Sequence, residues 1–189
     1  MTVHNFEVDL QKRINSKLNS YLNSNSQIEE AIKFALSAPG KRVRPILIYL
    51  VGDIYDISLE KLDSLALASE IIHTYSLVHD DLPAMDDDDL RRGRPTVHKK
   101  WDLSTAILSG DVMLILAYQL FENYKGETFV SLAKLFSKTA IEVCEGQQMD
   151  IDFSKKDDVS ADDYLKMIEY KTCLLYTSPS PRDRTRSRM

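Results

Sequence analysis

Residues 62–95 read LDSLALASEIIHTYSLVHDDLPAMDDDDLRRGRP, and this stretch decides both the fold class and the chemistry of the chain. Its first half repeats apolar or small residues every three or four positions, which is the period of a helix with a buried face. Its second half holds six aspartates within ten positions, followed by three arginines within four. Carboxylates this close together repel one another at neutral pH. They become favourable if divalent cations lie among them and carry a polyanion that the arginines also bind.

The same helical period extends along most of the chain. Besides residues 62–80, the expected helices lie near residues 10–21, 28–36, 45–51, 104–124, 128–147 and 160–171. We find no stretch of strict alternation between turn signals, which a half-buried strand would require. The chain has 189 residues and 43% hydrophobic content, so it can bury one core. The sequence therefore predicts an all-α fold, with one domain over residues 1–172.

Bulk composition argues against several classes of function. A net charge of −5 disfavours a generic nucleic-acid-binding domain, which is usually basic. The two cysteines, Cys144 and Cys173, match neither a zinc motif nor a disulfide framework, so a reducing compartment fits. The N-terminal residues do not resemble a signal peptide, and the longest apolar run, residues 112–117, is too short to cross a bilayer. We expect a cytoplasmic protein without stable membrane insertion and without a nucleic-acid partner.

The composition changes abruptly at residue 173. Residues 173–189 read CLLYTSPSPRDRTRSRM, with four arginines, two prolines and one acidic residue, and cannot form an apolar helical face. The string resembles translated sequencing-adapter sequence fused to a truncated reading frame, and a native basic tail is the alternative. We therefore expect residues 173–189 to be non-native or disordered, and they take no part in the predicted fold.

The spacing of the aspartates predicts how two of them meet. His73 and Asp80 are seven residues apart, so they share one face of a helix. On an unbroken helix Asp86 would lie about 120° away from Asp80, too far round for both carboxylates to reach one ion cluster. Pro83 removes a backbone donor, so residues 82–85 can loop out and return Asp86 to Asp80. Two carboxylates that share phosphate oxygens with a cation suit Mg²⁺.

Two other readings of the acidic run remain to be weighed. A calcium loop that began at Asp86 would place Leu90, Arg91 and Val97 at positions that require an oxygen ligand, glycine and glutamate. This excludes an EF-hand. A solvated acidic turn without a ligand is the second alternative, and the arginines that follow the run argue against it.

A second basic cluster supports the prediction that the chain binds a polyanion. The segment GKRVRP (residues 40–45) places three cations around a predicted helix start, where free backbone N–H groups already favour anions. Such a cluster is often only a solvated face, and the arginines at 91, 92 and 94 could simply neutralise the aspartates. Together with His73, the two clusters predict two anion sites, one assembled through metal and one through direct cations.

Four motifs together resemble the bacterial-type trans-polyprenyl diphosphate synthases, which include farnesyl and geranylgeranyl diphosphate synthases. SLVHDDLPAMDDDDLRRGRPTVH (residues 76–98) is similar to their first aspartate-rich motif, and GKRVRP to their upstream basic motif. EGQQMD (residues 145–150) and KT (residues 171–172) are similar to their Gln-Asp and Lys-Thr motifs. The motifs follow the family order over residues 40–172. The resemblance implies an isoprenoid-synthase-type helical bundle that binds Mg²⁺, with Mn²⁺ as the alternative.

The resemblance also implies a role for each motif residue in joining an allylic diphosphate to isopentenyl diphosphate. The expected metal ligands are Asp80, Asp86 and, in an assisting role, Asp81. The residues expected to bind isopentenyl diphosphate are Lys41, Arg44, His73 and Arg92. Arg91 is expected to bind the allylic diphosphate, and the residues expected to contact it or the carbocation are Lys171, Thr172, Gln147 and Asp150. Asp80, Asp86 and Lys171 are expected to be the catalytic residues.

Product length is expected to depend on Tyr75 and Ser76, which precede Asp80 by about one helical turn. In the family the product grows down a tunnel between helices, so a bulky side chain here would form its floor. With the Leu-Pro-Ala insertion at residues 82–84, the pattern resembles that of short-chain enzymes. We expect farnesyl diphosphate as the product and geranylgeranyl diphosphate as the alternative. Tyr75 could also simply fill the core.

The chain departs from the family pattern after Lys171-Thr172. The family's second aspartate-rich motif, which holds further Mg²⁺, has no match there. The resemblance therefore implies a bundle that lacks its C-terminal helices, and we expect the polypeptide to be inactive by itself and, as in the family, to form a homodimer. A class I terpene cyclase is an alternative, although it would not need a second diphosphate site. A non-catalytic regulatory subunit of a synthase is another alternative.

Overall fold

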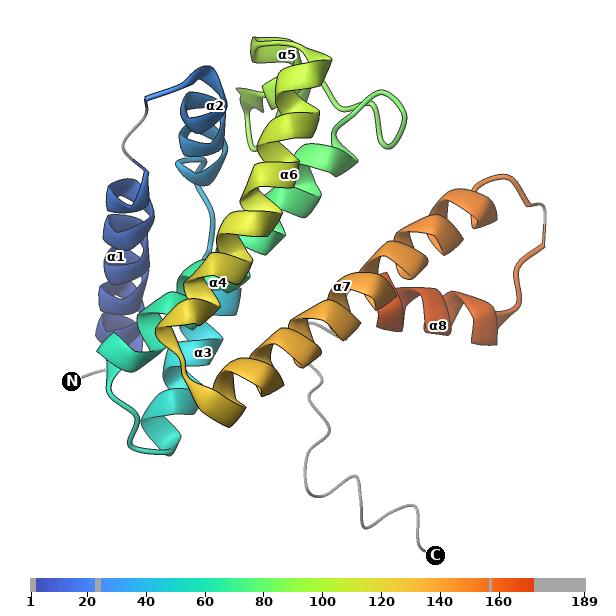
Figure 1. The fold of residues 1–189 in the computed structure, drawn as a ribbon. Coiled ribbons are helices and arrows are strands. Elements are labelled where there is room, and N and C mark those ends of the chain that lie inside the picture. Colours follow the sequence, from blue (N-terminus) through green and yellow to red (C-terminus); the bar gives the residue numbers. More distant parts are fainter. Residues whose placement is uncertain (1–2, 23–24, 157, 172–189) are drawn as a thin grey trace, which may run out of the picture. The chain divides into compact units, whose positions relative to one another are not determined.

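The computed structural model describes residues 3–22, 25–156 and 158–171. Thr172 and the tail at 173–189 lie outside the described residues, so the expectations for them stay predictions. In the described ranges the chain is mainly helical, which confirms the predicted all-α class (Figure 1). The described exception is a short antiparallel pair, β1 (Leu90–Arg91) with β2 (Arg94–Pro95), which the sequence did not predict.

The chain divides into two compact units, Met1–Lys125 and Gly126–Met189. The first contains α1 (Val3–Tyr21), α2 (Gln27–Leu36), α3 (Val43–Ile54), α4 (Leu59–Asp80), the β1–β2 hairpin, α5 (Val97–Lys100), α6 (Leu103–Gln119) and the 3-10 helix η1 (Leu120–Asn123). The second contains α7 (Gly126–Phe153) and α8 (Ala161–Lys171). Every helix expected from the apolar period is present, with ends that differ by up to seven residues, and the four-residue α5 was not expected.

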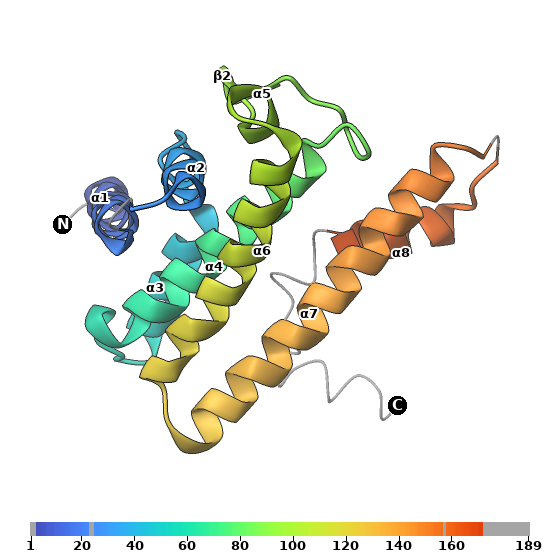
Figure 2. The ribbon, with the colours of Figure 1, turned by 45° about the horizontal axis from the view of Figure 1, so that its top comes forward.

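Helix α4 is the centre of the first unit. It lies between α3 and α6 (Figure 2) and also contacts α1 and α2. Side chains from six elements fill the core around it, among them Ile14, Ile32, Tyr49, Ile71, Met113 and Phe121. Because α4 has neighbours on several sides, it carries buried residues on more than one face. Its buried part fixes the direction in which its C-terminal end presents the aspartates.

Side-chain caps set where two helices of the first unit begin. Ser26 Oγ accepts a hydrogen bond from the backbone N–H of Glu29 at 3.2 Å, at the start of α2. Asp102 Oδ1 accepts one from the backbone N–H of Thr105 at 2.7 Å, at the start of α6. Each cap satisfies a backbone donor that the first turn of a helix leaves unpaired. The polar residues before these apolar runs therefore stop the helices from extending backwards.

The segment Leu103–Asn123 is, within the part of the chain that the structure describes, long and apolar enough to span a membrane by length and composition alone. It comprises α6 and η1, which contact α4, and α6 also contacts α2 and α5. Its buried side chains, including Met113, Ala117 and Phe121, belong to the core of the first unit. One face of the segment is therefore packed in the core, whereas Ile107, Leu108 and Ile115 are exposed.

The second unit is formed by α7 and α8, which contact each other directly. Ser160 caps α8, since its Oγ accepts the backbone N–H of Asp163 at 3.1 Å and lies 2.7 Å from the Asp163 carboxylate. The helices approach each other closely at Gly146, where a Cβ would collide with the backbone of Tyr170 and Lys171. Glycine at this position therefore allows the backbone of α8 to touch α7.

Candidate active site

The chain after α4 returns Asp86 to Asp80. Helix α4 ends at Asp80, and residues 82–85 then form a turn outside the helical path. The backbone N–H of Asp86 donates to the carbonyl of Asp80 at 2.8 Å, and that of Asp87 donates to the carbonyl of Leu82 at 3.1 Å. This confirms the loop that the helical period and Pro83 predicted. The roles of the two aspartates as metal ligands stay predictions.

Asp81, the residue expected to assist the two principal ligands, faces Arg91. It is only 3% exposed. Arg91 donates from Nε and Nη2 to Asp81 Oδ1 at 2.8 and 2.5 Å, and from Nη2 to Asp88 Oδ2 at 2.9 Å. Burial raises the pKa of Asp81, and the Arg91 guanidinium opposes that shift. Asp81 therefore holds Arg91 at the site in this conformation, a contact that the spacing of the aspartates did not predict.

A tight hairpin directs Arg91 and Arg92 to different partners. Arg91 pairs with Arg94 across the β1–β2 ladder, and Arg92 and Gly93 form the two-residue turn. Both turn residues have positive φ, 54° and 76°, as in the type I′ turn that matches the twist of a hairpin. Arg92 Nη1 donates to the carbonyl of Pro39 at 2.8 Å. The Arg-Gly pair is a weak turn signal, and the sequence reasoning missed it.

The basic cluster (Arg42, Arg44, His73 and Arg92) joins segments that lie far apart in the sequence. Burial lowers the pKa of His73 to about 3, and the charges of Arg44, Arg92 and Arg42 contribute to the decrease. His73 is therefore neutral at pH 7 and can exchange hydrogen bonds with an anion without carrying charge. The structure thus groups three of the four residues expected to bind isopentenyl diphosphate. The fourth, Lys41, is exposed beside Arg42.

Tyr75 lies on α4 beside His79, which contacts α6. Its ring meets that of His79 edge to face, with 4.9 Å between ring centroids. His79 Nε2 lies 3.1 Å from the carbonyl of Ile107, and a Cβ at Gly110 would collide with the His79 ring. Tyr75 therefore belongs to a close contact between α4 and α6, which suits either a tunnel floor or core filling. Ser76 Oγ donates to the carbonyl of His73 at 3.0 Å.

In the second unit, the expected residues on α7 and α8 meet within that unit. Lys171 forms an ion pair with Asp150, which neutralises both charges in this conformation. Gln147 is buried, and its Nε2 has no hydrogen-bond partner among the described residues. The Gln-Asp motif and Lys171 are therefore neighbours, whereas Thr172 lies outside the described residues.

The described residues include carboxylates of the kind that suits Mg²⁺, but no metal site enclosed by protein alone. The described ranges contain no group of three or more histidine, cysteine, aspartate or glutamate side chains placed to hold a metal ion. Mg²⁺ characteristically takes one or two carboxylates and completes its shell with water and substrate phosphates. Asp80 and Asp86, joined through their backbones, can supply two such carboxylates.

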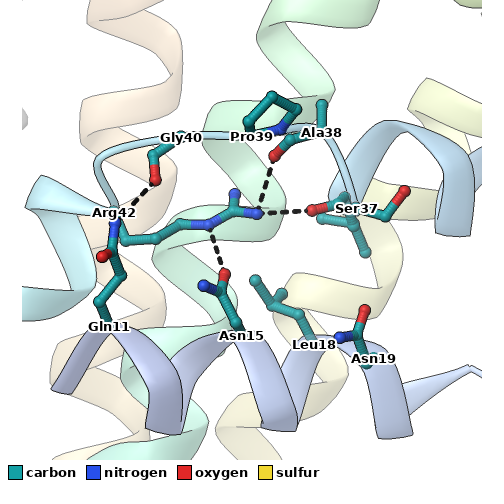
Figure 3. Close-up of a pocket in the computed structure, with 10 residues that line it drawn as sticks. Gln11, Asn15, Leu18, Asn19, Ser37, Ala38, Pro39, Gly40 and Arg42 are labelled. Atoms are coloured by element: carbon teal, nitrogen blue, oxygen red, sulfur yellow. Dashed lines mark hydrogen bonds between the residues drawn. The ribbon is translucent and has the colours of Figure 1, made fainter. Parts of the chain in front are cut away.

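One surface pocket, of about 410 Å³, lies next to the residues that follow α2 (Figure 3). Its wall is formed by side chains of α1 and by the segment after α2; the lining residues are Gln11, Asn15, Leu18, Asn19, Leu36, Ser37, Ala38, Pro39, Gly40 and Arg42. None of them is a residue that the sequence analysis assigned to substrate or metal. The pocket is therefore not the predicted site, although Arg42 belongs to both the pocket wall and the basic cluster.

Comparison with known proteins gives one consistent family. Residues 25–181 match the Polyprenyl synthetase family. The chain is 36% identical to geranylgeranyl diphosphate synthase of Methanosarcina mazei over 154 residues (80% of this chain, 47% of the relative). It is 41% identical to farnesyl diphosphate synthase of Escherichia coli over 139 residues (70% and 46%). The chain thus spans about half the length of the relatives it matches.

Solved structures agree with the sequence comparison. A crystal structure of a geranylgeranyl pyrophosphate synthase superposes with a TM-score of 0.82 at 42% identity, covering 93% of this chain and 54% of the other. The geranyltransferase of Legionella pneumophila gives a TM-score of 0.86 at 32% identity, covering 96% and 72%. The motifs, the helical fold and these matches agree: the chain belongs to the polyprenyl synthetase family and has the helical fold of isoprenoid synthases.

Proposed function

We propose that this chain carries the substrate-binding residues of a trans-prenyltransferase. The reaction joins dimethylallyl or geranyl diphosphate to isopentenyl diphosphate and releases diphosphate. The observation that carries the proposal is that the first unit contains both an acidic pair, Asp80 and Asp86, and the basic cluster. The Asp86–Asp80 backbone bond of 2.8 Å brings two carboxylate-bearing residues together, and the basic cluster surrounds His73 on the same helix that ends at Asp80. Family membership supports the same assignment.

The acidic residues act on the allylic substrate in this proposal. Asp80 and Asp86 would hold Mg²⁺, which when bound would neutralise charge on the departing diphosphate. Arg91 binds the same diphosphate after it exchanges its contacts with Asp81 and Asp88 for phosphate oxygens. These groups stabilise the diphosphate more strongly as it departs than in the ester, so they lower the barrier to breaking the allylic C–O bond.

The basic residues hold the second substrate. Arg44, Arg92 and Lys41 supply positive charge for isopentenyl diphosphate, and neutral His73 supplies a hydrogen bond. This arrangement places one diphosphate on direct cations, so the acceptor needs no metal of its own. In the second unit, Lys171, Gln147 and Asp150 contact the allylic diphosphate or the carbocation region, with Lys171 leaving Asp150 when the anion binds.

We infer a short-chain product, farnesyl diphosphate, with geranylgeranyl diphosphate as the alternative. The position of Tyr75 one turn before Asp80 and its contact with His79 support a floor close to the reacting end of the chain. The relatives include synthases named for farnesyl, geranylgeranyl and geranylfarnesyl diphosphate, so the family leaves product length open. We also infer a soluble cytoplasmic protein that forms a homodimer, as the family resemblance implies.

The proposal is tested by combining binding and product analysis on the purified chain. Radiolabelled isopentenyl diphosphate is offered with dimethylallyl diphosphate and Mg²⁺, and bound label and prenyl products are measured separately. Bound isopentenyl diphosphate supports the proposal, and labelled C10 or C15 products would also refute the expected inactivity of the chain by itself. Failure to bind isopentenyl diphosphate at millimolar concentration, together with the absence of labelled product, would contradict the proposal.

The same assay separates the alternatives. A terpene cyclase would release hydrocarbon from an allylic diphosphate supplied alone and would not bind isopentenyl diphosphate. A regulatory subunit would bind diphosphates without turnover and would retain an active synthase in a pull-down. The geometry of the basic cluster favours the prenyltransferase over the cyclase, because it supplies cations for a second diphosphate.

A further inference from the structure

We propose that Arg42 is a positioning residue for the isopentenyl diphosphate side of the site. It acts by fixing the α2–α3 connection (residues 37–42), on which the arginines of the hairpin rest. The inference rests on the proposed function, because it concerns how that diphosphate site is held in shape. The family resemblance assigned roles to Lys41 and Arg44, on either side of Arg42, and left Arg42 itself without one.

The guanidinium of Arg42 is buried and joins three helices. The residue is 6% exposed. Nη1 donates to Glu70 Oε1 on α4 at 2.6 Å, and Nη2 donates to the carbonyls of Leu36 and Ala38 at 2.8 and 3.0 Å. Nε donates to Asn15 Oδ1 on α1 at 2.9 Å (Figure 3). Lysine has the charge but not the planar fork, so it could satisfy only part of this set.

The hairpin rests on the segment that Arg42 fixes. Arg92 Nη1 donates to the carbonyl of Pro39, and Arg94 Nη1 donates to Ser37 Oγ at 3.3 Å. A Cβ at Gly40 would collide with the Arg92 guanidinium, so glycine is needed for this close approach. The path from Arg42 to Arg92 is therefore short. Arg42 donates to the carbonyl of Ala38, and Arg92 donates to the carbonyl of the next residue, Pro39.

Glu70 is the buried carboxylate that pairs with Arg42. It is 2% exposed and lies three residues before His73, hence on the same face of α4. Burial lowers the pKa of Arg92, the neighbouring arginines lower it further, and the charge of Glu70 opposes them. Glu70 thus offsets part of the repulsion among the arginines before any diphosphate binds. Arg42 and Glu70 together allow a cationic site to form in the absence of its ligand.

A partly buried ion pair on the same helix provides a control. Asp63 is 7% exposed on α4 and binds Arg13 of α1, with 2.8 Å from Arg13 Nε to Asp63 Oδ1. Its other partners are Tyr49 and Lys17. None of these residues is expected to bind diphosphate. Loss of the Asp63 charge therefore weakens a buried contact between α1 and α4 without disturbing the α2–α3 connection.

The test measures affinity and stability together. Isopentenyl diphosphate is titrated calorimetrically in Mg²⁺-free buffer into the full chain and into its R42K and D63N variants, and thermal unfolding of each is recorded. We expect R42K to bind about tenfold more weakly, and D63N to stay within about twofold of the original chain although its unfolding temperature also falls. Unchanged affinity in R42K, or an equal loss in D63N, would overturn the positioning role.

A third variant keeps the test decisive if R42K does not fold. Gly40→Ala leaves the Arg42 network in place and displaces the Arg92 guanidinium, so we expect weaker binding with an unfolding temperature close to the original. Unchanged affinity in G40A would overturn the proposed path from the connection to Arg92. An unmodified chain that binds no isopentenyl diphosphate would instead refute the proposed function, and with it any positioning role for that site.

Discussion

The acidic loop (residues 80–89) and the basic cluster lie in one unit, but their charges are balanced by different means. In the loop, Asp81 is buried against Arg91, but Asp88 and Asp89 pair with Arg91 and Lys99 at partly exposed positions, at 2.9 and 2.7 Å. In the basic cluster, the almost fully buried carboxylate of Glu70 pairs with the buried guanidinium of Arg42 at 2.6 Å, and His73 stays neutral. Exposed pairs exchange easily with a metal or a phosphate, whereas a buried pair is permanent. The comparison predicts a loop that adapts to its ligands and a preformed basic cluster.

The largest expected effect is the loss of stability when the buried pair is broken. Glu70→Ala leaves the Arg42 guanidinium buried without its carboxylate, so we expect the free energy of unfolding to fall by about 3–5 kcal/mol. Asp88→Ala removes a partner from an exposed pair, and we expect a change below about 1 kcal/mol. Urea denaturation of the two variants measures both. Equal losses of unfolding free energy in the two variants would show that the charges of the acidic loop and of the basic cluster are balanced in the same way.

The pH dependence of stability tests the neutral state of His73. Its pKa is about 3 in the folded chain against 6.5 for the unfolded residue, so the unfolded chain binds an extra proton between these values. Stability is therefore undiminished above pH 6.5 and falls as the pH decreases toward 3, by about 1 kcal/mol per pH unit from this group. His73→Asn should remove that part of the slope. The difference in unfolding free energy between the two proteins, measured from pH 7 to 4, checks the sign.

An unchanged slope in the His73→Asn variant would contradict this account. It would mean that His73 titrates with its usual pKa and that the arginines do not lie close to it. The basic cluster would then be a set of separate surface cations.

A smaller and more specific effect concerns Tyr75, which lies between His73 and Asp80 on α4. If Tyr75 forms the floor of the product tunnel, Tyr75→Ala should lengthen the products of an active synthase that contains this chain, from C15 toward C20 and beyond. Chromatography of the dephosphorylated products measures the distribution. Ser76→Ala, at the adjacent position, is the matched control for a general disturbance of α4. An unchanged distribution in Tyr75→Ala would leave the residue with a packing role only.

The features that sequence could predict are those that depend on neighbouring residues. The return of Asp86 follows from the helical period and from the missing donor of Pro83, both of which are local. The pairing of Arg42 with Glu70 joins residues 28 positions apart, and no local pattern specifies it. The engagement of Asp81 with Arg91 likewise depends on the hairpin, whose turn places Arg92 at a positive φ that non-glycine residues rarely adopt. The motifs could therefore be recognised from the sequence, and the contacts that hold them could not.

The comparison between the acidic loop and the basic cluster is tested most directly by measuring how the affinity for each diphosphate depends on Mg²⁺. Isopentenyl diphosphate and dimethylallyl diphosphate are titrated calorimetrically into the chain with Mg²⁺ and again with excess chelator. Because the acceptor site is built from direct cations, we predict that isopentenyl diphosphate keeps its affinity within about twofold without Mg²⁺. Dimethylallyl diphosphate should lose measurable binding without Mg²⁺, and the D80N/D86N variant should reproduce that loss in its presence. Equal dependence of the two diphosphates on Mg²⁺ would contradict the account.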